Sequence, residues 1–174
     1  TVWGRYQPHL AADGTVLGFY LFVMDITERK QAEEQVRASE ARFRQLAEAM
    51  PQIVWVCNAE GAITYINEQW QVYSGISFAQ TLAHGMWPAL HPHDLVPNQA
   101  QWQLALQSGQ AYEAELRLRR ADGEYRWHLE RAVPIRNAAG VIEQWFGASF
   151  DIDDHKRAQD ALALTLEIVE LPGV

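Results

Sequence analysis

A single cysteine, Cys57, occurs among the 174 residues, so no disulfide can form within the chain. This scarcity is typical of proteins from reducing compartments, and we expect a cytoplasmic location. No apolar run approaches the ~18 residues that a membrane-spanning helix needs. The longest run, 16–24, predicts a buried strand instead. The sequence therefore argues against a disulfide-stabilised secreted domain and against membrane contact in this segment.

A basic patch is also missing. The net charge is −8, and the densest group of arginines is interleaved with acidic residues. Because nucleic-acid binders concentrate Lys and Arg on one face, we expect no nucleic-acid partner. That group consists of Arg117, Arg119, Arg120 and Arg126, among Glu113, Glu115 and Glu124.

Catalytic motifs are equally scarce. There is no glycine-rich phosphate loop and no nucleophile elbow, so we predict that this chain is not itself an enzyme. The segment His91-Pro92-His93-Asp94 has metal-ligating residue types, but no second cluster completes a tetrahedral shell. We therefore favour a structural role for it, with Asp94 capping the helix that follows, and predict no metal site.

A repeat dominates what is present. Residues 5–32 recur at 131–158, shifted by 126 positions without a gap, and both copies leave through Asp-Ile into a polar helix. A fixed-period recurrence indicates a module used in series. We expect residues 1–27 to be the C-terminal hairpin of a preceding module, cut from a longer protein. The identical pairs are Arg5/Arg131, Pro8/Pro134, Ala12/Ala138, Gly14/Gly140, Asp25/Asp151, Ile26/Ile152, Lys30/Lys156 and Ala32/Ala158.

Residues 28–49 form the clearest predicted helix, within a linker at 28–50. It is rich in Glu, Gln, Ala and Arg, with Thr27 as its N-cap and Pro51 closing it. Apolar or small residues recur at spacings of four and three, as in a short heptad seam. Two interpretations stay open: a dimer-forming coiled coil, or a helix lying on its own domain. The seam residues are Val36, Phe43, Leu46 and Met50.

Residues 51–153 predict an α+β module in the order two strands, helices, three strands. The stretch 78–95 reads as short turns, and the next helix is expected to begin at Asp94 or Asn98. We predict a five-stranded antiparallel sheet with helices on one face and helical linkers on either side. Gly147, in the middle of the last strand, indicates close approach by a ligand or another backbone.

Five segments, taken in order and spacing, resemble a PAS domain with its C-terminal PAC segment, as found in bacterial sensor kinases and cyclic-di-nucleotide enzymes. The resemblance implies a sensory, dimerising module in which a signal from the core leaves through the last strand. Asp151, and Asp25 in the first copy, are the implied coupling residues; local capping of the helix is the alternative role. The five segments are 40–46, 55–67, 87–94, 116–127 and 145–153.

Cofactors of such domains find little support here. The helix expected to carry a haem-ligating histidine, 96–108, has none, and Cys57 lies on a strand rather than in a photoadduct helix motif. Neither haem nor a flavin photoadduct is therefore predicted, and the sequence requires no cofactor. Ser149 either contacts a ligand or relieves crowding.

Seven tryptophans are a high count for 174 residues. They indicate either an aromatic pocket for a small molecule or a filled core without space. The candidate pocket residues are Trp55, Trp70, Trp102, Leu116, Trp127, Trp145, Gly147 and Ser149.

We interpret the chain as a sensory module of a multi-domain signalling protein, with a histidine kinase as the favoured parent. The alternatives are a chromophore-binding receptor and a ligand-free dimerisation scaffold of a cyclic-di-nucleotide enzyme. Residues 154–174 are expected to begin an exit helix, and no role is assigned to 163–174.

Overall fold

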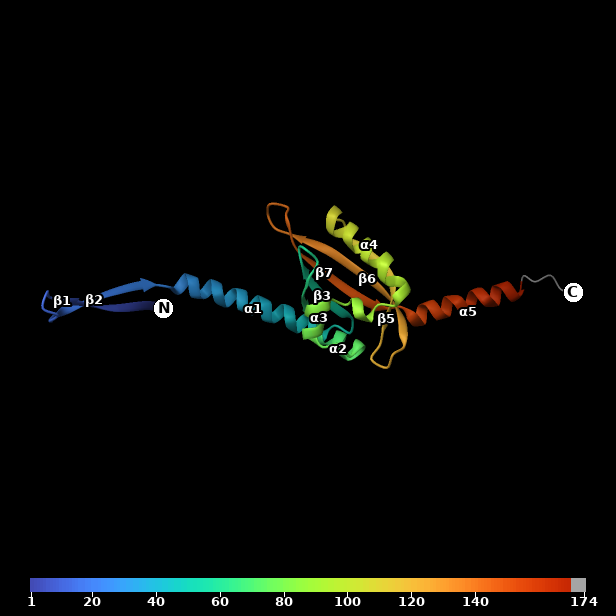
Figure 1. Cartoon of the computed structure of the whole chain (residues 1–174), viewed down its shortest axis with the longest axis horizontal. Coiled ribbons are helices and arrows are strands. Elements are labelled where there is room, and N and C mark those ends of the chain that lie inside the picture. Colours follow the sequence, from blue (N-terminus) through green and yellow to red (C-terminus); the bar gives the residue numbers. More distant parts are fainter. Residues whose placement is uncertain (170–174) are drawn as a thin grey trace. The chain divides into compact units, whose positions relative to one another are not determined.

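The computed structural model describes residues 1–169 as two separate units, 1–46 and 47 onward (Figure 1). The expected final segment, 163–174, lies partly outside this range, at 170–174. The elements are β1 (Val2–Leu10), β2 (Val16–Asp25), α1 (Thr27–Ala49), β3 (Ile53–Asn58), β4 (Ile63–Ile66), α2 (Glu68–Ser74), α3 (Phe78–His84), η1 (Trp87–Ala89), α4 (Pro92–Ser108), β5 (Tyr112–Arg119), β6 (Tyr125–Arg136), β7 (Ile142–Asp151) and α5 (Asp153–Val169).

The second unit contains the predicted five-stranded antiparallel sheet, in the order β4-β3-β7-β6-β5. Helices α2 and α4 and the short η1 bury their apolar side chains on one face of this sheet. Trp70 of α2, Ala89 of η1 and Trp102 of α4 are among the buried side chains from these helical segments. The α+β prediction is thus confirmed, and the core lies between one sheet face and its helices.

Two helical features differ from the prediction: one additional helix and one earlier helix start. Residues 78–84 form α3, where turns were expected, because Ser77 and Gln80 make a reciprocal capping box. Helix α4 begins at Pro92, earlier than predicted, since proline suits the first helical position and the His91 side chain accepts a hydrogen bond from the His93 N–H. Asp94 therefore does not start the helix; it binds Arg117 of β5 instead.

The sequence repeat is a structural repeat. All nine residue pairs between β1 and β2 recur between β6 and β7 at a shift of 126, from Val2↔Asp25 and His128↔Asp151 onward. The register shift near the far end of each hairpin recurs as well. Backbone pairing is therefore conserved between the copies, although most of the side chains differ.

Both copies also leave the hairpin in the same way. The Asp25 carboxylate accepts a hydrogen bond from the Thr27 N–H at 2.9 Å, and Asp151 accepts one from the Asp153 N–H at 3.0 Å. Thr27, predicted as the N-cap, is the first residue of α1, and the side chain that satisfies its N–H is Asp25. The aspartate of each exit thus satisfies one free N–H of the helix that follows.

Candidate functional site

The helix-covered face of the sheet carries a cavity of about 60 Å³. Trp55 from β3, Leu116 from β5 and Glu130 from β6 line it on the sheet side, and Trp102 of α4 lines it from the helices. Trp55 and Trp102 meet edge to face, with ring centroids 5.7 Å apart. We call this space the inner cavity; it combines aromatic walls with one carboxylate.

Glu130 is the unusual residue of this cavity, because it is 4% exposed yet ionisable. Its Oε2 accepts a hydrogen bond from Trp55 Nε1 at 3.1 Å, whereas Oε1 has no partner with hydrogen-bond geometry. Burial raises the pKa of Glu130 to about 7, although Trp55 and the nearby Ser149 hydroxyl favour the ionised form. The carboxyl group therefore changes charge near neutral pH.

This pKa predicts a pH-dependent stability. Because the unfolded chain ionises Glu130 near its ordinary value of 4.5, the free energy of unfolding should fall as pH rises from there towards 7. The loss attributable to Glu130 is about 3 kcal/mol. Urea unfolding of the wild type and of Glu130→Gln at pH 4.5 and 7.5 measures it, since Gln retains an acceptor for Trp55. Equal pH dependence in both proteins would contradict this assignment.

A second space, the side hollow, opens near the end of β7 and has a volume of about 410 Å³. His128, Ser149 and Asp151 line it from the sheet, and Tyr73 lines it from α2. The His128 Nδ1 lies 3.0 Å from the Ser149 Oγ, and burial lowers the pKa of His128 to about 4. His128 is therefore neutral at physiological pH and has a structural contact with Ser149.

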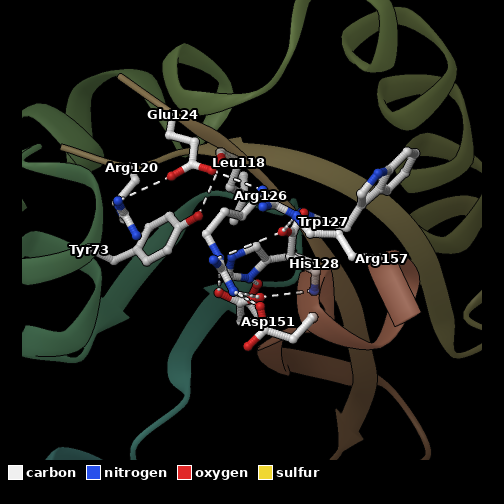
Figure 2. A network of polar contacts seen from close by, with 12 residues as sticks. Tyr73, Leu118, Arg120, Glu124, Arg126, Trp127, His128, Asp151 and Arg157 are labelled. Carbon is white, nitrogen blue, oxygen red and sulfur yellow. Dashed lines mark hydrogen bonds and ion pairs between the residues drawn. The ribbon is translucent and has the colours of Figure 1, made fainter. Parts of the chain in front are cut away.

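Asp151 connects this hollow with the exit helix (Figure 2). Arg126 of β6 donates to Asp151 with its Nε at 2.7 Å and to Asp154 of α5 at 2.9 Å. Burial alone would raise the pKa of Asp151, but the hydrogen bonds from Arg126 and from the Asp153 N–H, together with the nearby positive charge of Arg126, outweigh burial and hold that pKa below the ordinary value. Arg126 thus links the last strand and the first turn of α5 through two carboxylates.

The first turn of α5 has further anchors on β6. The Asp153 side chain, 3% exposed, accepts a hydrogen bond from the Trp127 N–H, and the Trp127 carbonyl accepts one from the Ile152 N–H. Arg157 pairs with Asp153 and also reaches Glu124 at 2.9 Å. Any shift of the end of β7 must therefore move or break contacts with this turn.

The structure brings only some of the predicted pocket residues together. Trp55, Trp102 and Leu116 line the inner cavity, whereas Trp70 and Trp145 are fully buried beside it without lining it. Trp70 Nε1 donates to the Thr81 hydroxyl at 2.7 Å, so its role is in packing α2 against α3. The aromatic core is thus partly filled and partly open.

Two of the predicted positions have another role. Trp127 lies on the opposite face of β6, where its ring contacts Arg117 and Lys156, so its assignment to the pocket is corrected. At Gly147 the close approach is made by the Trp55 indole, not by a ligand or a backbone: an added Cβ would lie 2.3 Å from that ring. Ser149 lines the side hollow and contacts His128.

The sequence analysis assigned no core or site contacts to three important residues. Glu130, Arg126 and Asn67 are polar, and polar residues in strands and turns are usually exposed. The alternation of apolar and charged residues in 112–119 predicts that Ala114 points into the core. Glu130 pairs with Ala114 across the strands, so this pattern could have indicated that Glu130 also points inward. The pairing register needed to use that signal is a property of the tertiary structure.

Within residues 1–169, no three His, Cys, Asp or Glu side chains gather closely enough to hold a metal ion. In the same part of the chain, no helix is long and apolar enough to cross a bilayer. The predicted seam residues Val36, Phe43, Leu46 and Met50 are between 38% and 59% exposed.

Comparison with known proteins gives a consistent picture. The model of the family described as PAS fold matches residues 63–149. The peroxide stress-activated histidine kinase mak1 of Schizosaccharomyces pombe is 35% identical over 173 residues, which cover 91% of this chain and 11% of that protein. The two-component sensor PprA of Pseudomonas aeruginosa is 27% identical, covering 92% of this chain and 18% of its own length. The chain thus spans less than a fifth of these relatives.

Solved structures agree on the fold. A PAS domain from Colwellia psychrerythraea superposes with a TM-score of 0.56 at 18% identity, covering 66% of this chain and 97% of that one. The N-terminal domain of a diguanylate cyclase with PAS/PAC sensor from Marinobacter aquaeolei has a TM-score of 0.52 at 26% identity, covering 60% and 98%.

Proposed function

Because this chain belongs to the PAS fold family and is a sensory module of a signalling protein, we propose that it relays a signal from its core through β7 to α5. We further propose that the whole protein is a histidine kinase, as two of its relatives are named a histidine kinase and a two-component sensor. A diguanylate cyclase is the alternative output, since a 26% identical domain comes from such an enzyme.

The observation that carries the relay is the position of Asp151. It is the last residue of β7, it lines the side hollow, and it satisfies the N–H of Asp153 at the start of α5. Through Arg126 it is also linked to Asp154. A rearrangement of the core that moves the end of β7 therefore changes contacts at the base of the output helix.

The preceding hairpin supports a serial arrangement. β1 and β2 reproduce the register of β6 and β7, and Asp25 holds the start of α1 as Asp151 holds that of α5. Large apolar side chains are exposed on both faces of this hairpin, among them Trp3, Phe19 and Phe22. An isolated hairpin is marginal in water, so these side chains suit the core of a larger module. We therefore propose that residues 1–27 end a preceding module of the same kind, and that α1 connects the two.

Replacement of Asp151 by alanine in the full-length protein tests the relay. We expect the signal-dependent change in phosphorylation to fall at least fivefold, since losing a cap and an ion pair costs about 1–2 kcal/mol. Autophosphorylation with radioactive ATP measures it, and formation of a cyclic dinucleotide would identify the alternative output. The matched control is Asp122→Ala, which removes an exposed turn carboxylate paired with Arg120. Unchanged output in Asp151→Ala would refute the relay.

The exposed stripe on α1 leads us to propose homodimerisation through this helix. Leu46, a seam residue, is 58% exposed, as expected of an apolar side chain that packs against a partner helix. We expect Leu46→Glu to weaken the dimer at least tenfold in analytical ultracentrifugation, whereas Gln45→Glu, one position off the seam, should leave it unchanged. Equal dimer affinity in the two variants would remove the basis for this interface.

A further inference from the structure

The inner cavity contains a buried carboxylate whose hydrogen bonding is incomplete. Oε2 of Glu130 accepts a hydrogen bond from Trp55 and the Ser149 hydroxyl lies nearby, but the buried Oε1 has no partner with hydrogen-bond geometry among the described residues. An unsatisfied buried carboxylate oxygen is costly, so native structures usually provide it with a donor or a counter-charge. The structure thus presents a site where a donor from outside the chain would be stabilising.

The walls around this oxygen are aromatic. Trp102 meets the Trp55 ring at 5.7 Å and the Tyr112 ring at 5.2 Å, both nearly edge to face, and Trp87 completes the lining. Indole and phenol rings attract cations over their faces, and cages of such rings recognise alkylated ammonium groups. The aromatic walls and the Glu130 carboxylate therefore both favour a positively charged ligand.

Among the residues that the structure describes, none of those lining the cavity is basic. The titratable groups facing Glu130 are Cys57 and Tyr112, and burial raises the pKa of both, that of Cys57 to about 12. His128, on the same strand, is neutral above pH 5 because burial lowers its pKa to about 4. An anionic ligand would therefore meet a carboxylate without any compensating cation, whereas a cationic ligand would neutralise it.

Size restricts the ligand further. A volume of about 60 Å³ accommodates roughly four or five water-sized groups, since each needs about 10–15 Å³. Drug-sized ligands occupy pockets of ~300 Å³ or more. The lining residues that keep some exposure, including Gly61, Gly85 and Trp87, form the side nearest to solvent.

We propose that the inner cavity binds a small alkylammonium ion of about four or five heavy atoms, with its N–H directed at Glu130 Oε1 and its alkyl groups against Trp55 and Trp102. This inference deepens the proposed sensory function and rests on it, because it names the chemical class of the signal. The aromatic and carboxylate groups distinguish such a cation from a neutral molecule of the same size.

Isothermal titration calorimetry of the 174-residue chain at pH 8 tests this proposal, with trimethylammonium chloride as ligand and tert-butanol as a neutral compound of similar size. We expect trimethylammonium to bind at least tenfold more tightly than tert-butanol. Glu130→Gln should weaken its binding at least tenfold, while Glu113→Gln, on the exposed side of β5, should not change it. Affinity should also fall severalfold from pH 8 to pH 6, as Glu130 takes up a proton.

No binding of trimethylammonium, equal binding of tert-butanol, or full affinity in Glu130→Gln would each overturn the proposal. If Glu130→Gln does not fold, Trp87→Leu at the partly exposed rim of the cavity replaces it. We expect this variant to lose at least threefold in affinity for trimethylammonium, and unchanged affinity would also overturn the proposal. The two proposals can fail independently. If Asp151→Ala leaves phosphorylation unchanged while the chain binds trimethylammonium as expected, the relay is refuted and the ligand proposal is not.

Discussion

Replacement of Gly147 by alanine is expected to lower the free energy of unfolding of the second unit by about 4 kcal/mol, above the usual range for one extra methyl group in a core. The added Cβ would lie 2.3–2.6 Å from three atoms of the Trp55 indole. That ring cannot easily withdraw, because its Nε1 donates a hydrogen bond to Glu130 and the ring packs edge to face with the Trp102 indole.

Chemical denaturation followed by circular dichroism measures this effect, and Trp55→Phe offers a control. A smaller ring leaves space at position 147, so the double variant Gly147→Ala/Trp55→Phe should be more stable than the sum of the two single changes predicts. Additive effects, or a loss below 1 kcal/mol in Gly147→Ala, would show that Trp55 moves aside at little cost.

Replacement of Asn67 by alanine is the second large effect, about 4 kcal/mol of unfolding free energy from three buried or partly buried groups left unpaired. Asn67 is 1% exposed, and its Oδ1 accepts a hydrogen bond from the Val54 N–H at 3.0 Å. Its Nδ2 donates to the carbonyls of Ala47 and Gln52, both at 2.9 Å. One amide therefore connects the last turn of α1, the turn after it and the start of β3.

Asn58 provides a matched control, since its side chain accepts one hydrogen bond, from the Ala62 N–H in an exposed turn. We expect Asn58→Ala to cost less than about 1 kcal/mol. Hydrogen exchange adds a local measurement: protection of the Val54 amide should fall in Asn67→Ala and remain in Asn58→Ala. Equal losses of stability in the two variants would mean that water replaces the Asn67 amide.

The chain's local signals determined its order of elements. Pro51 ended the first linker helix as predicted, because the residue before a proline avoids the helical conformation. The repeat at 126 residues predicted two hairpins with the same exit, and the pairing register confirms it. Alternation in 112–119 likewise identified the inward side of β5. These features depend on neighbours close in sequence, so sequence alone suffices for them.

The two faces of β6 show what sequence alone left open. Trp127 and Glu130 are an odd number of positions apart on β6, so their side chains point to opposite faces of the sheet. From residue type alone, the tryptophan would be expected inside and the carboxylate outside. Pairing with β5 decides the reverse, because His128 and Glu130 lie opposite Leu116 and Ala114, which face the helices. Only the assembled sheet determines which side of such a strand becomes the core.

The same reason applies to the inner cavity and to Gly147. Whether aromatic residues fill a core or leave space depends on ring orientations, which are set by contacts between segments as distant as Trp55 and Glu130. Gly147 in β7 predicted that another group lies close to the backbone there. That group is the Trp55 indole of β3, which long-range strand pairing places opposite Gly147. Sequence thus determined most of the elements and their order, with α3 as an exception, whereas packing across the sheet decided which side chains make the site.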